Sequence, residues 1–160
     1  MAKKNKEISS SNLIKVKPIT EGQKSVFETW KQGKNQFLFG CAGTGKTFVS
    51  LYLAMQDVLD LKTKYDKVIL VRSLIPTREI GFLPGDEEDK AALYQVPYQN
   101  MVKFMFEQPN EQAFNMLYDR LKNQGSLYFL STSFLRGLTF DNSIIICLLY
   151  TSPSPRDRSS

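Results

Sequence analysis

Hydrophobic residues recur at helical spacing in several parts of the chain. Between positions 20 and 32 they follow Thr20 and Gln23, which have the spacing of a capping box, and this pattern predicts a helix over about 20–32. A wide apolar stripe that no Gly or Pro interrupts predicts a largely buried helix over about 47–61. Two more helices, divided by Pro109, are predicted over residues 96–107 and 110–123.

Short, continuous apolar runs predict buried strands over 36–39 and 67–71. The first run enters a glycine-rich loop, and strand, loop, helix and strand follow one another within about 36 residues, which is the length of a βαβ unit. We therefore expect parallel pairing with a right-handed crossover. Further strands are predicted over 126–130 and 143–146, whereas 72–90, punctuated by Pro and Gly and ending in acidic residues, is expected to be irregular.

The chain has 160 residues, of which 42% are hydrophobic, and this suffices for one folded α/β domain. It contains no apolar run long enough to span a membrane and no apolar segment of a secretory signal, so we expect a cytoplasmic protein without a membrane partner. The absence of histidine excludes Ser-His catalysis and histidine-bound metals. Two cysteines do not form a disulfide framework.

The net charge of +5 comes from the two ends of the chain. Residues 1–18 carry five lysines and one glutamate, whereas residues 19–146 carry 14 basic and 14 acidic residues. We expect residues 1–17 to form a flexible basic arm on a neutral body. Such an arm is more often simply solvated than a specific nucleic-acid site, and both interpretations stay open.

Residues 40–47 read GCAGTGKT and match the phosphate-binding pattern G-x-x-x-x-G-K-[ST] without a mismatch, between a predicted strand and a predicted helix. Small residues let the backbone amides curve around a phosphate, and the helix N-terminus favours the anion. Lys46 is expected to contact the β- and γ-phosphates, and the Thr47 hydroxyl to ligate Mg²⁺. The predicted nucleotide-binding residues are Gly40, Cys41, Ala42, Gly43, Thr44, Gly45, Lys46 and Thr47.

Two alternatives accompany these residues. The glycine-rich segment is a helix cap without a ligand in the simpler interpretation, although four fixed positions in the correct context match rarely by chance. A run of aromatic residues further along has the composition of a base-stacking surface, but its helical spacing is more typical of a core. These aromatic residues are Tyr94, Tyr98, Phe104 and Phe106.

The phosphate loop, VRSLIPTREIGFLPGD and FLRGLTFDNSIII together resemble the PhoH-like family of phosphate-starvation-inducible P-loop ATPases, over about 18–146. The chain departs from the family pattern at Ser73, where Pro is common, and at Leu138, where a second Arg is usual. The resemblance implies a P-loop NTPase with a RecA- or helicase-like parallel sheet. It also implies ATP as ligand, suggests RNA or single-stranded nucleic acid as partner, and suggests a homo-oligomeric parent protein.

The same resemblance suggests roles for three residues outside the loop. Gln23 is a candidate adenine-reading glutamine, although a helix-capping role explains it equally well. Arg72 follows the second strand and is a candidate phosphate or nucleic-acid contact, against the alternative of an ion pair with the acids at 86–89. Arg136 is a candidate contact to nucleic acid or to a neighbouring subunit's nucleotide, against simple solvation.

A carboxylate that would hold Mg²⁺ at the end of the last strand, the Walker B acid, is missing from the sequence. Asp141 precedes that strand, and Asp157 lies in a tail rich in Ser, Pro and Arg. The family pattern stops in mid-motif, and residues 147–160 resemble translated adapter sequence. We expect a domain over 18–146 that is truncated at its C-terminus, followed by a non-native tail, with a disordered natural tail as the alternative.

The sequence therefore predicts an ATP- and Mg²⁺-binding member of the P-loop class whose parent hydrolyses ATP, with Lys46 as the catalytic residue. Whether this chain is itself an enzyme stays open, because the acid is missing. One alternative is a non-catalytic nucleic-acid-binding module that uses the lysine-rich arm, Arg72 and Arg136. A small-molecule kinase is the other, although no Arg-rich lid segment follows the third strand.

Overall fold

A computed structural model describes residues 6–72 and 87–148, and it contains a parallel sheet with helices packed against it. The elements run in the order η1 (Ser10–Asn12), α1 (Glu21–Lys31), α2 (Lys46–Leu59), β1 (Lys67–Arg72), α4 (Glu87–Phe106), α5 (Glu111–Asn123), β2 (Leu127–Ser131), η2 (Thr132–Phe134) and β3 (Ser143–Leu148). Most of the segment predicted to be irregular, residues 73–86, and the tail beyond residue 148 lie outside the described residues. The prediction is wrong at the two ends of the segment, because Arg72 ends β1 and residues 87–90 belong to α4.

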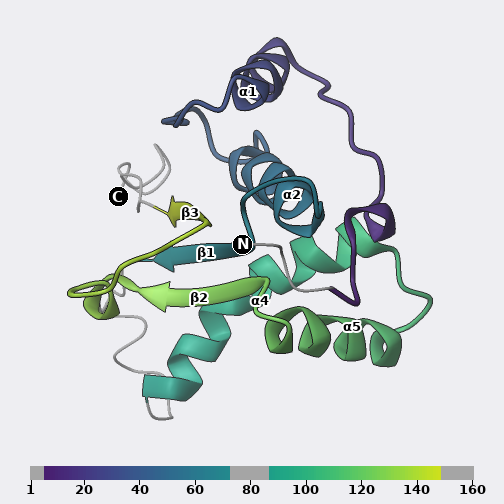
Figure 1. Ribbon diagram of the computed structural model, residues 1–160, viewed down its shortest axis with the longest axis vertical. Helices are drawn as coiled ribbons and strands as arrows, with labels where there is room; N and C mark the ends of the chain where they lie inside the picture. Colours follow the sequence, from purple (N-terminus) through teal and green to yellow (C-terminus); the bar gives the residue numbers. More distant parts are fainter. Residues whose placement is uncertain (1–5, 73–86, 149–160) are drawn as a thin grey trace, which may run out of the picture.

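The sheet has three strands in the order β2-β1-β3, and both pairings are parallel (Figure 1). Val68 of β1 lies beside Leu127 of β2 and Ile144 of β3, so one register runs straight across the sheet. Each connection between neighbouring strands passes through at least one helix or a long loop, as parallel pairing requires. The predicted α/β fold with a parallel sheet is confirmed.

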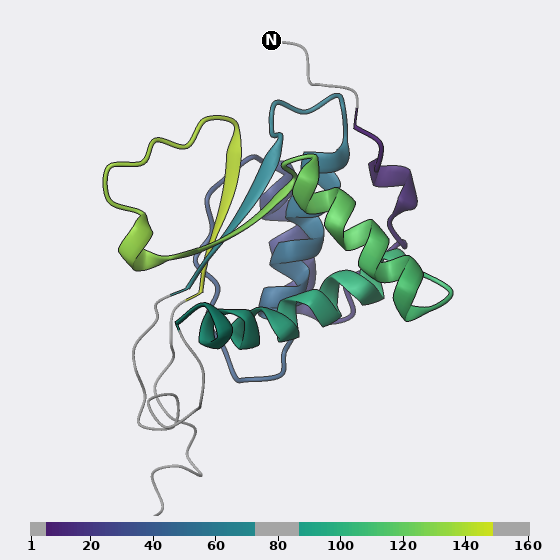
Figure 2. The ribbon, with the colours of Figure 1, turned by 90° about the horizontal axis from the view of Figure 1, so that it is seen from below.

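The described helices cover one face of the sheet (Figure 2). Val68 and Leu70 of β1 belong to the hydrophobic core that this face forms with α2, α4 and α5. Residues Ile145 and Cys147 of β3 alternate with core-facing ones and are exposed. The alternation follows from the period of two along a strand, which gives neighbouring side chains opposite faces.

Helix α2 forms the centre of the core. Leu51, Ala54 and Met55 are fully buried, and so are Val58 and Leu59 at its end. A buried aliphatic side chain of this size contributes about 1.5–3 kcal/mol relative to an exposed one. The free energy of unfolding therefore depends more on α2 than on any other element whose burial the structure describes.

The predicted strand over 36–39 is wrong. These residues are not part of the sheet, and the side chains of Phe37 and Phe39 are 75% and 85% exposed. β1 has β2 on one side and β3 on the other, so the apolar run does not find a neighbour among the described strands. An apolar pattern indicates a preference for burial, but strand formation also needs a partner edge for the backbone.

The N-terminal segment also differs from its prediction as a flexible arm, as far as it is described. From residue 6 onwards it lies against the body, with Ile8 and Leu13 buried in the core. The Lys6 ammonium group donates hydrogen bonds to the Val58 carbonyl and the Ser126 hydroxyl. Two buried apolar side chains and a partly buried amine explain why this stretch packs although its composition is polar.

The other predicted elements have the expected types. Thr20 caps α1 as predicted, and Asn110 caps α5 by accepting a hydrogen bond from the amide of Ala113. α4 begins well before the predicted helix over 96–107 and continues through Pro97. Proline in a helix interior removes one backbone hydrogen bond, which lowers the stability of the helix. A helix that is packed against the rest of the protein can nevertheless continue through it.

Candidate functional site: the phosphate loop and its neighbours

The loop over residues 40–45 precedes α2 and lies at the end of the molecule toward which the three strands point (Figures 1 and 2). Open parallel sheets bind their ligands outside the carboxyl ends of the strands. The loop is thus at the edge where such proteins place a ligand, even though the residues before it do not form a strand. Its position is set by α2, whose first turn begins at Lys46.

The backbone of the loop has the shape of an anion-binding nest. Gly43 and Gly45 have φ angles of +79° and +83°, a conformation that side chains strongly disfavour, and Gly45 is the N-cap of α2. Within the described residues, no backbone amide from residue 40 to 45 donates a hydrogen bond to a protein group. Unpaired amides at a helix N-terminus are the donors that a phosphate group accepts from.

The Lys46 side chain folds back over the loop. Its ammonium group donates hydrogen bonds to the carbonyl oxygens of Gly40, at 2.8 Å, and Cys41, at 2.7 Å. The Thr44 hydroxyl, 3.4 Å from the ammonium group, donates to the same Cys41 carbonyl at 2.9 Å. These bonds close the loop on itself and hold one positive charge among its amide hydrogens, which favours an anionic ligand.

Gln23 lies against the loop and uses both ends of its amide. Its side-chain carbonyl accepts from the amides of Ile19, at 2.8 Å, and Thr20, at 3.5 Å, and this completes the capping box of α1. Its side-chain amide donates to the Thr44 carbonyl at 3.3 Å. The cap interpretation of Gln23 is confirmed, and the same side chain joins α1 to the loop, a contact that the sequence did not indicate.

Thr47 and the end of β3 are the places where Mg²⁺ chemistry was expected. Within the described residues the Thr47 hydroxyl has no protein partner, so its oxygen is available to a cation. β3 ends in Cys147 and Leu148 without a carboxylate, and Asp141 is exposed ahead of its first residue. In the described part of the chain, no three Asp, Glu or Cys residues cluster in a manner that would hold a metal.

One candidate arginine lies at the carboxyl end of a strand, and the other lies beyond the carboxyl end of the neighbouring strand. Arg72 ends β1 and lies opposite Ser131, the last residue of β2. Its guanidinium group stacks on the Tyr94 ring, with 4.5 Å between the guanidinium carbon and the ring centroid. Arg136 is exposed in the turn after η2. The structure thus gives Arg72 an aromatic partner, whereas its predicted ion-pair partners at 86–89 are not described with side chains.

The aromatic run of α4 divides into core and surface. Phe106 is buried, Tyr98 packs on Phe129, and Tyr94 lies under Arg72. Phe104 alone of the four is strongly exposed, at 64%, and its ring meets the Phe48 ring edge to face with 5.7 Å between centroids. The expectation of a core is therefore wrong for Phe104. Phe48 was missed as its neighbour because it belongs to the apolar stripe of α2.

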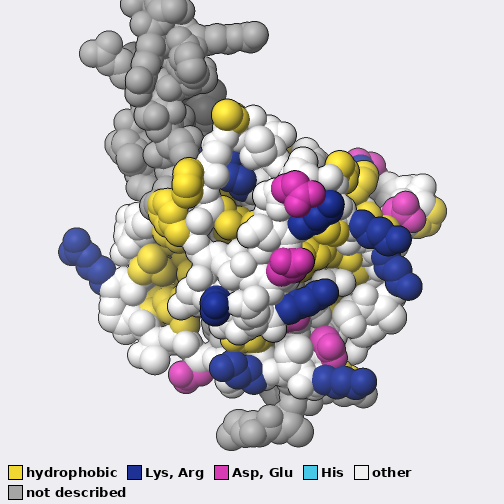
Figure 3. Space-filling model, turned by 90° about the horizontal axis from the view of Figure 1, so that it is seen from above, with side chains coloured by type: hydrophobic (Ala, Val, Ile, Leu, Met, Phe, Trp, Pro, Cys, Tyr) yellow, Lys and Arg dark blue, Asp and Glu magenta, His cyan; other side chains and the backbone are white. Residues whose placement is uncertain are grey.

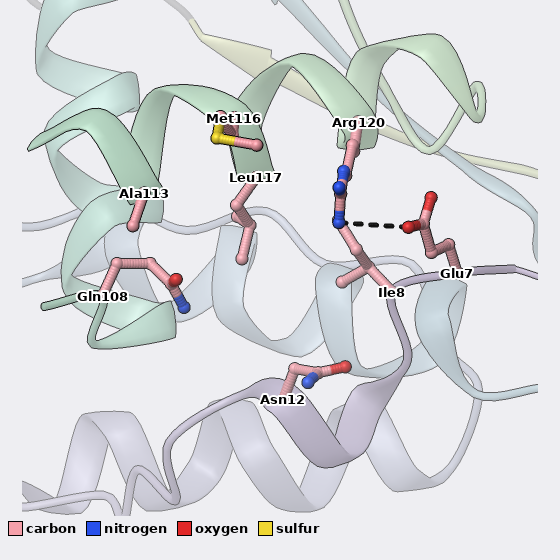
Figure 4. A pocket seen from close by; sticks show the side chains of 8 residues that line it. All are labelled: Glu7, Ile8, Asn12, Gln108, Ala113, Met116, Leu117 and Arg120. Carbon is pink, nitrogen blue, oxygen red and sulfur yellow. Dashed lines mark ion pairs between the residues drawn. The ribbon is translucent and has the colours of Figure 1, made fainter.

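A hollow lies away from the loop, between the N-terminal segment and α5 (Figure 4). It has a volume of about 320 Å³, and Arg120 of α5 forms an ion pair with Glu7 across it at 3.0 Å. Both side chains are more than half exposed, so the pair contributes little to stability. We assign this hollow to the docking of the N-terminal segment, because Ile8 from that segment forms part of its wall.

No helix in the described ranges is both long and apolar enough to cross a lipid bilayer. The longest, α4, includes charged and polar residues throughout its length.

Comparison with known proteins gives a consistent result. The sequence profile of the family described as "PhoH-like protein" matches residues 15–147. The chain is 31% identical over 112 residues to Protein PhoH of Escherichia coli K12, which covers 69% of this chain and 29% of that protein. It is 29% identical over 110 residues to Protein PhoH2 of Bacillus subtilis, covering 68% and 24%. A PhoH-like protein of Bacillus subtilis is 29% identical over 134 residues, covering 83% and 39%. The chain therefore spans about a quarter to two fifths of these relatives.

Proposed function

The chain belongs to the PhoH-like family and is a P-loop ATPase-type protein, and from this premise we propose that residues 40–47 bind ATP with Mg²⁺. The observation that carries the proposal is the nest of unpaired amides closed by Lys46. The amides would donate hydrogen bonds to the β-phosphate oxygens, and Lys46 would exchange its carbonyl partners for β- and γ-phosphate oxygens. Cys41, Ala42 and the other small residues of the loop would let the phosphates approach the backbone.

The Thr47 hydroxyl fits a magnesium ligand, because this hard oxygen lies directly after the lysine and has no protein partner among the residues that the structure describes. When bound, Mg²⁺ neutralises charge on the phosphate oxygens. Gln23 would fix the shape of the loop through the Thr44 carbonyl, and its amide is our candidate contact for the adenine base. The parent protein would hydrolyse ATP, with Lys46 stabilising the charge that develops on the transferred phosphate.

We expect this chain itself to bind nucleotide and to hydrolyse little of it. The reason is that β3 ends without the carboxylate that orders metal and water in this class. A turnover number in the range of about 1–100 s⁻¹, as found for enzymes of phosphoryl transfer, would contradict this part of the proposal.

The direct test is equilibrium binding of a fluorescent ATP analogue to Lys46→Ala, with and without Mg²⁺. We expect the affinity to fall at least tenfold, which corresponds to about 1.4 kcal/mol, because a charge-assisted contact to phosphate is lost. Lys34→Ala is the matched control, since Lys34 is exposed on the segment that leads to the loop. Equal affinities of the two variants would refute nucleotide binding by this loop.

A coupling of the parent activity to RNA or single-stranded nucleic acid is the second part of the proposal. Arg72, stacked on Tyr94 at the carboxyl edge of the sheet, and the exposed Arg136 support it, because both present a cation where strands end. Arg136 is also our candidate for a contact to the nucleotide of a neighbouring copy in a homo-oligomer. Retention of full oligonucleotide affinity in an Arg72→Ala, Arg136→Ala double variant would contradict the first of these roles.

A further inference from the structure

A shallow hollow opens beside the first turn of α2, one residue after Thr47. Its volume is about 390 Å³, and its walls are Phe48 of α2 with Asn100, Met101 and Phe104 of α4. Phe104 is 64% exposed, although a phenylalanine of a packed helix is normally buried. Behind it, the Phe48 ring stacks nearly parallel on the Tyr52 ring, at 9° and 6.5 Å between centroids. The Phe104 ring thus contacts Phe48, which packs on Tyr52, and its other side is exposed to solvent.

The N-terminal segment brings positive charge to this surface. The amide of Ile14 donates to the Met105 carbonyl at 2.8 Å, and the amide of Val16 donates to the Tyr52 hydroxyl at 3.1 Å. These two bonds fix the segment beside the hollow at residues that adjoin its walls. Lys15 and Lys17 alternate with the half-buried Ile14 and Val16, and both lysines are exposed.

Neither lysine is engaged by an acid within the described residues. Lys103, which is next to Phe104 in α4, differs from them because it forms an ion pair with Glu111 of α5. Lys15 and Lys17 are therefore the free cations that this segment offers beside the hollow. An exposed aromatic ring with unpaired lysines on the adjoining segment is the combination that binds a base and its backbone phosphates in single-stranded nucleic acid.

We propose that this surface, formed by Phe48, Phe104, Lys15 and Lys17, binds a single strand of nucleic acid. One base stacks on the exposed Phe104 ring, and the neighbouring phosphates lie at the two lysines. The Asn100 side chain is exposed at the rim, where its amide reaches the edge of the stacked base. The inference deepens the proposed coupling to nucleic acid and rests on it, and it adds a surface on α2 and α4 to the contacts proposed for Arg72 and Arg136.

Fluorescence anisotropy with a labelled twelve-residue oligouridylate tests the stacking contact in the full chain. We expect Phe104→Ala to weaken binding by about fivefold to a hundredfold, which is the usual effect of losing one base stack. Phe104→Trp keeps the stack and should bind at least as tightly as the unmodified chain. Met116→Ala is the matched control, because Met116 is also an exposed apolar residue, at 53%, but lies on α5.

The salt dependence of binding tests the two lysines separately. For single strands the slope of log affinity against log salt changes by about 0.7 for each phosphate contact, so Lys15→Gln with Lys17→Gln should lower it by about 1.4. Phe104→Ala should leave the slope unchanged, because stacking releases no counterions. Lys31→Gln with Lys34→Gln is the control pair at the other end of α1.

The outcomes separate this inference from nucleotide binding at the loop. Lys46→Ala should lose the ATP analogue and keep the oligonucleotide, whereas Phe104→Ala should do the reverse. The inference is overturned if the unmodified chain fails to bind oligouridylate, or if Phe104→Ala and Met116→Ala bind alike. It is also overturned if an apolar peptide displaces the oligonucleotide from a Phe104-dependent site, which would indicate a protein partner.

Circular dichroism checks that Phe104→Ala is folded. Should it unfold, Asn100→Glu decides the question, because an exposed carboxylate at the rim repels phosphates without removing any packed group. Unchanged affinity in Asn100→Glu at low salt would then refute the proposed surface.

Discussion

The segment that leads into the phosphate loop and the helix that leaves it are adjacent in the sequence and opposite in their environment. Residues 46–59 form α2, where most of the apolar side chains are buried in the core. Residues 33–40 make no hydrogen bonds from backbone to backbone beyond the turn at Gly33 within the described structure, and Phe37 and Phe39 are exposed. Figure 3 shows that hydrophobic side chains lie at the surface in several places on this face of the molecule, many of them at its left side.

This difference shows that the loop is held by contacts from α1 and α2 and not by the sheet. Lys46 and Gln23 hold it through the carbonyls of Gly40, Cys41 and Thr44, whereas the sheet does not contact it through a paired strand. A site that depends on a few polar contacts is easier to alter than one embedded in a core. The exposed side chains of Phe37 and Phe39 also favour aggregation, because an extended apolar segment without a paired strand promotes association between chains.

The largest expected difference between the two regions is in stability. Met55 is fully buried in α2, so Met55→Ala should lower the free energy of unfolding by about 2–5 kcal/mol through the cavity it leaves. Phe39→Ala removes a larger side chain but one that is 85% exposed, and it should change that free energy by no more than about 0.5 kcal/mol. Urea unfolding followed by circular dichroism measures both.

A similar loss in the two variants would show that Phe39 is buried in solution and would remove the contrast between the regions. Val49→Ala, also in the buried stripe of α2, serves as a second core variant with a smaller deletion.

The next largest effect is a pH dependence of the free energy of unfolding that arises from a buried tyrosine in the packed region. Burial raises the pKa of Tyr118 in α5 to about 12 from its usual value near 10. Below pH 10 the phenol is protonated in the folded and unfolded states and has no effect. Between pH 10 and about 12 the unfolded chain releases this proton and the folded chain keeps it, so the free energy of unfolding falls, by roughly 2 kcal/mol at the upper end.

Tyr118→Phe should remove this part of the alkaline destabilisation. Urea unfolding of both proteins at pH 9 and pH 11.5 gives the change in the free energy of unfolding for each. The difference between the two changes belongs to Tyr118, because the other tyrosines and the lysines contribute equally to both proteins. Identical pH dependence of the two proteins would mean that the phenol is in contact with water in solution.

The smallest effect tests how the loop is held. Gln23→Glu keeps a side-chain oxygen for the α1 capping box but removes the donor to the Thr44 carbonyl. We expect stability to stay within about 0.5 kcal/mol and the affinity for the ATP analogue to fall several-fold, since the loop loses a contact. Thr20→Ala should do the opposite, costing about 1 kcal/mol of stability as a lost cap.

Calorimetric melting and nucleotide titration distinguish the two variants. If Gln23→Glu binds nucleotide as well as the unmodified chain, the contact between Gln23 and Thr44 has no role in the site.

Much of the fold was predictable because local signals agree with the final structure. The cap at Thr20 and the apolar stripe of α2 depend on neighbours a few positions away. The strand over 36–39 was not predictable in the same way, because a strand exists only when another strand pairs with it. The N-terminal segment was misjudged for a related reason, since its polar composition conceals the two buried residues, Ile8 and Leu13.

The candidate site divides in the same manner. The order of residues in the loop predicted a phosphate-binding turn of small residues directly before a helix, because that pattern needs only eight consecutive positions, and the loop does precede α2. Neither the contact of Gln23 with Thr44 nor the hollow between Phe48 and Phe104 follows from the sequence, since their partners are 21 and more positions apart.

By itself, the sequence determined the phosphate-binding pattern, the cap of α1 at Thr20 and the parallel α/β class, because each depends on short-range spacing and on the preference of apolar residues for burial. Only the tertiary structure decided which apolar residues found a partner. Phe106 is in the core and Phe104 is on the surface two positions earlier, because burial depends on what packs against each side of the helix. The docked N-terminal segment is the same case, as its lysines acquire a neighbouring aromatic surface only through chain folding.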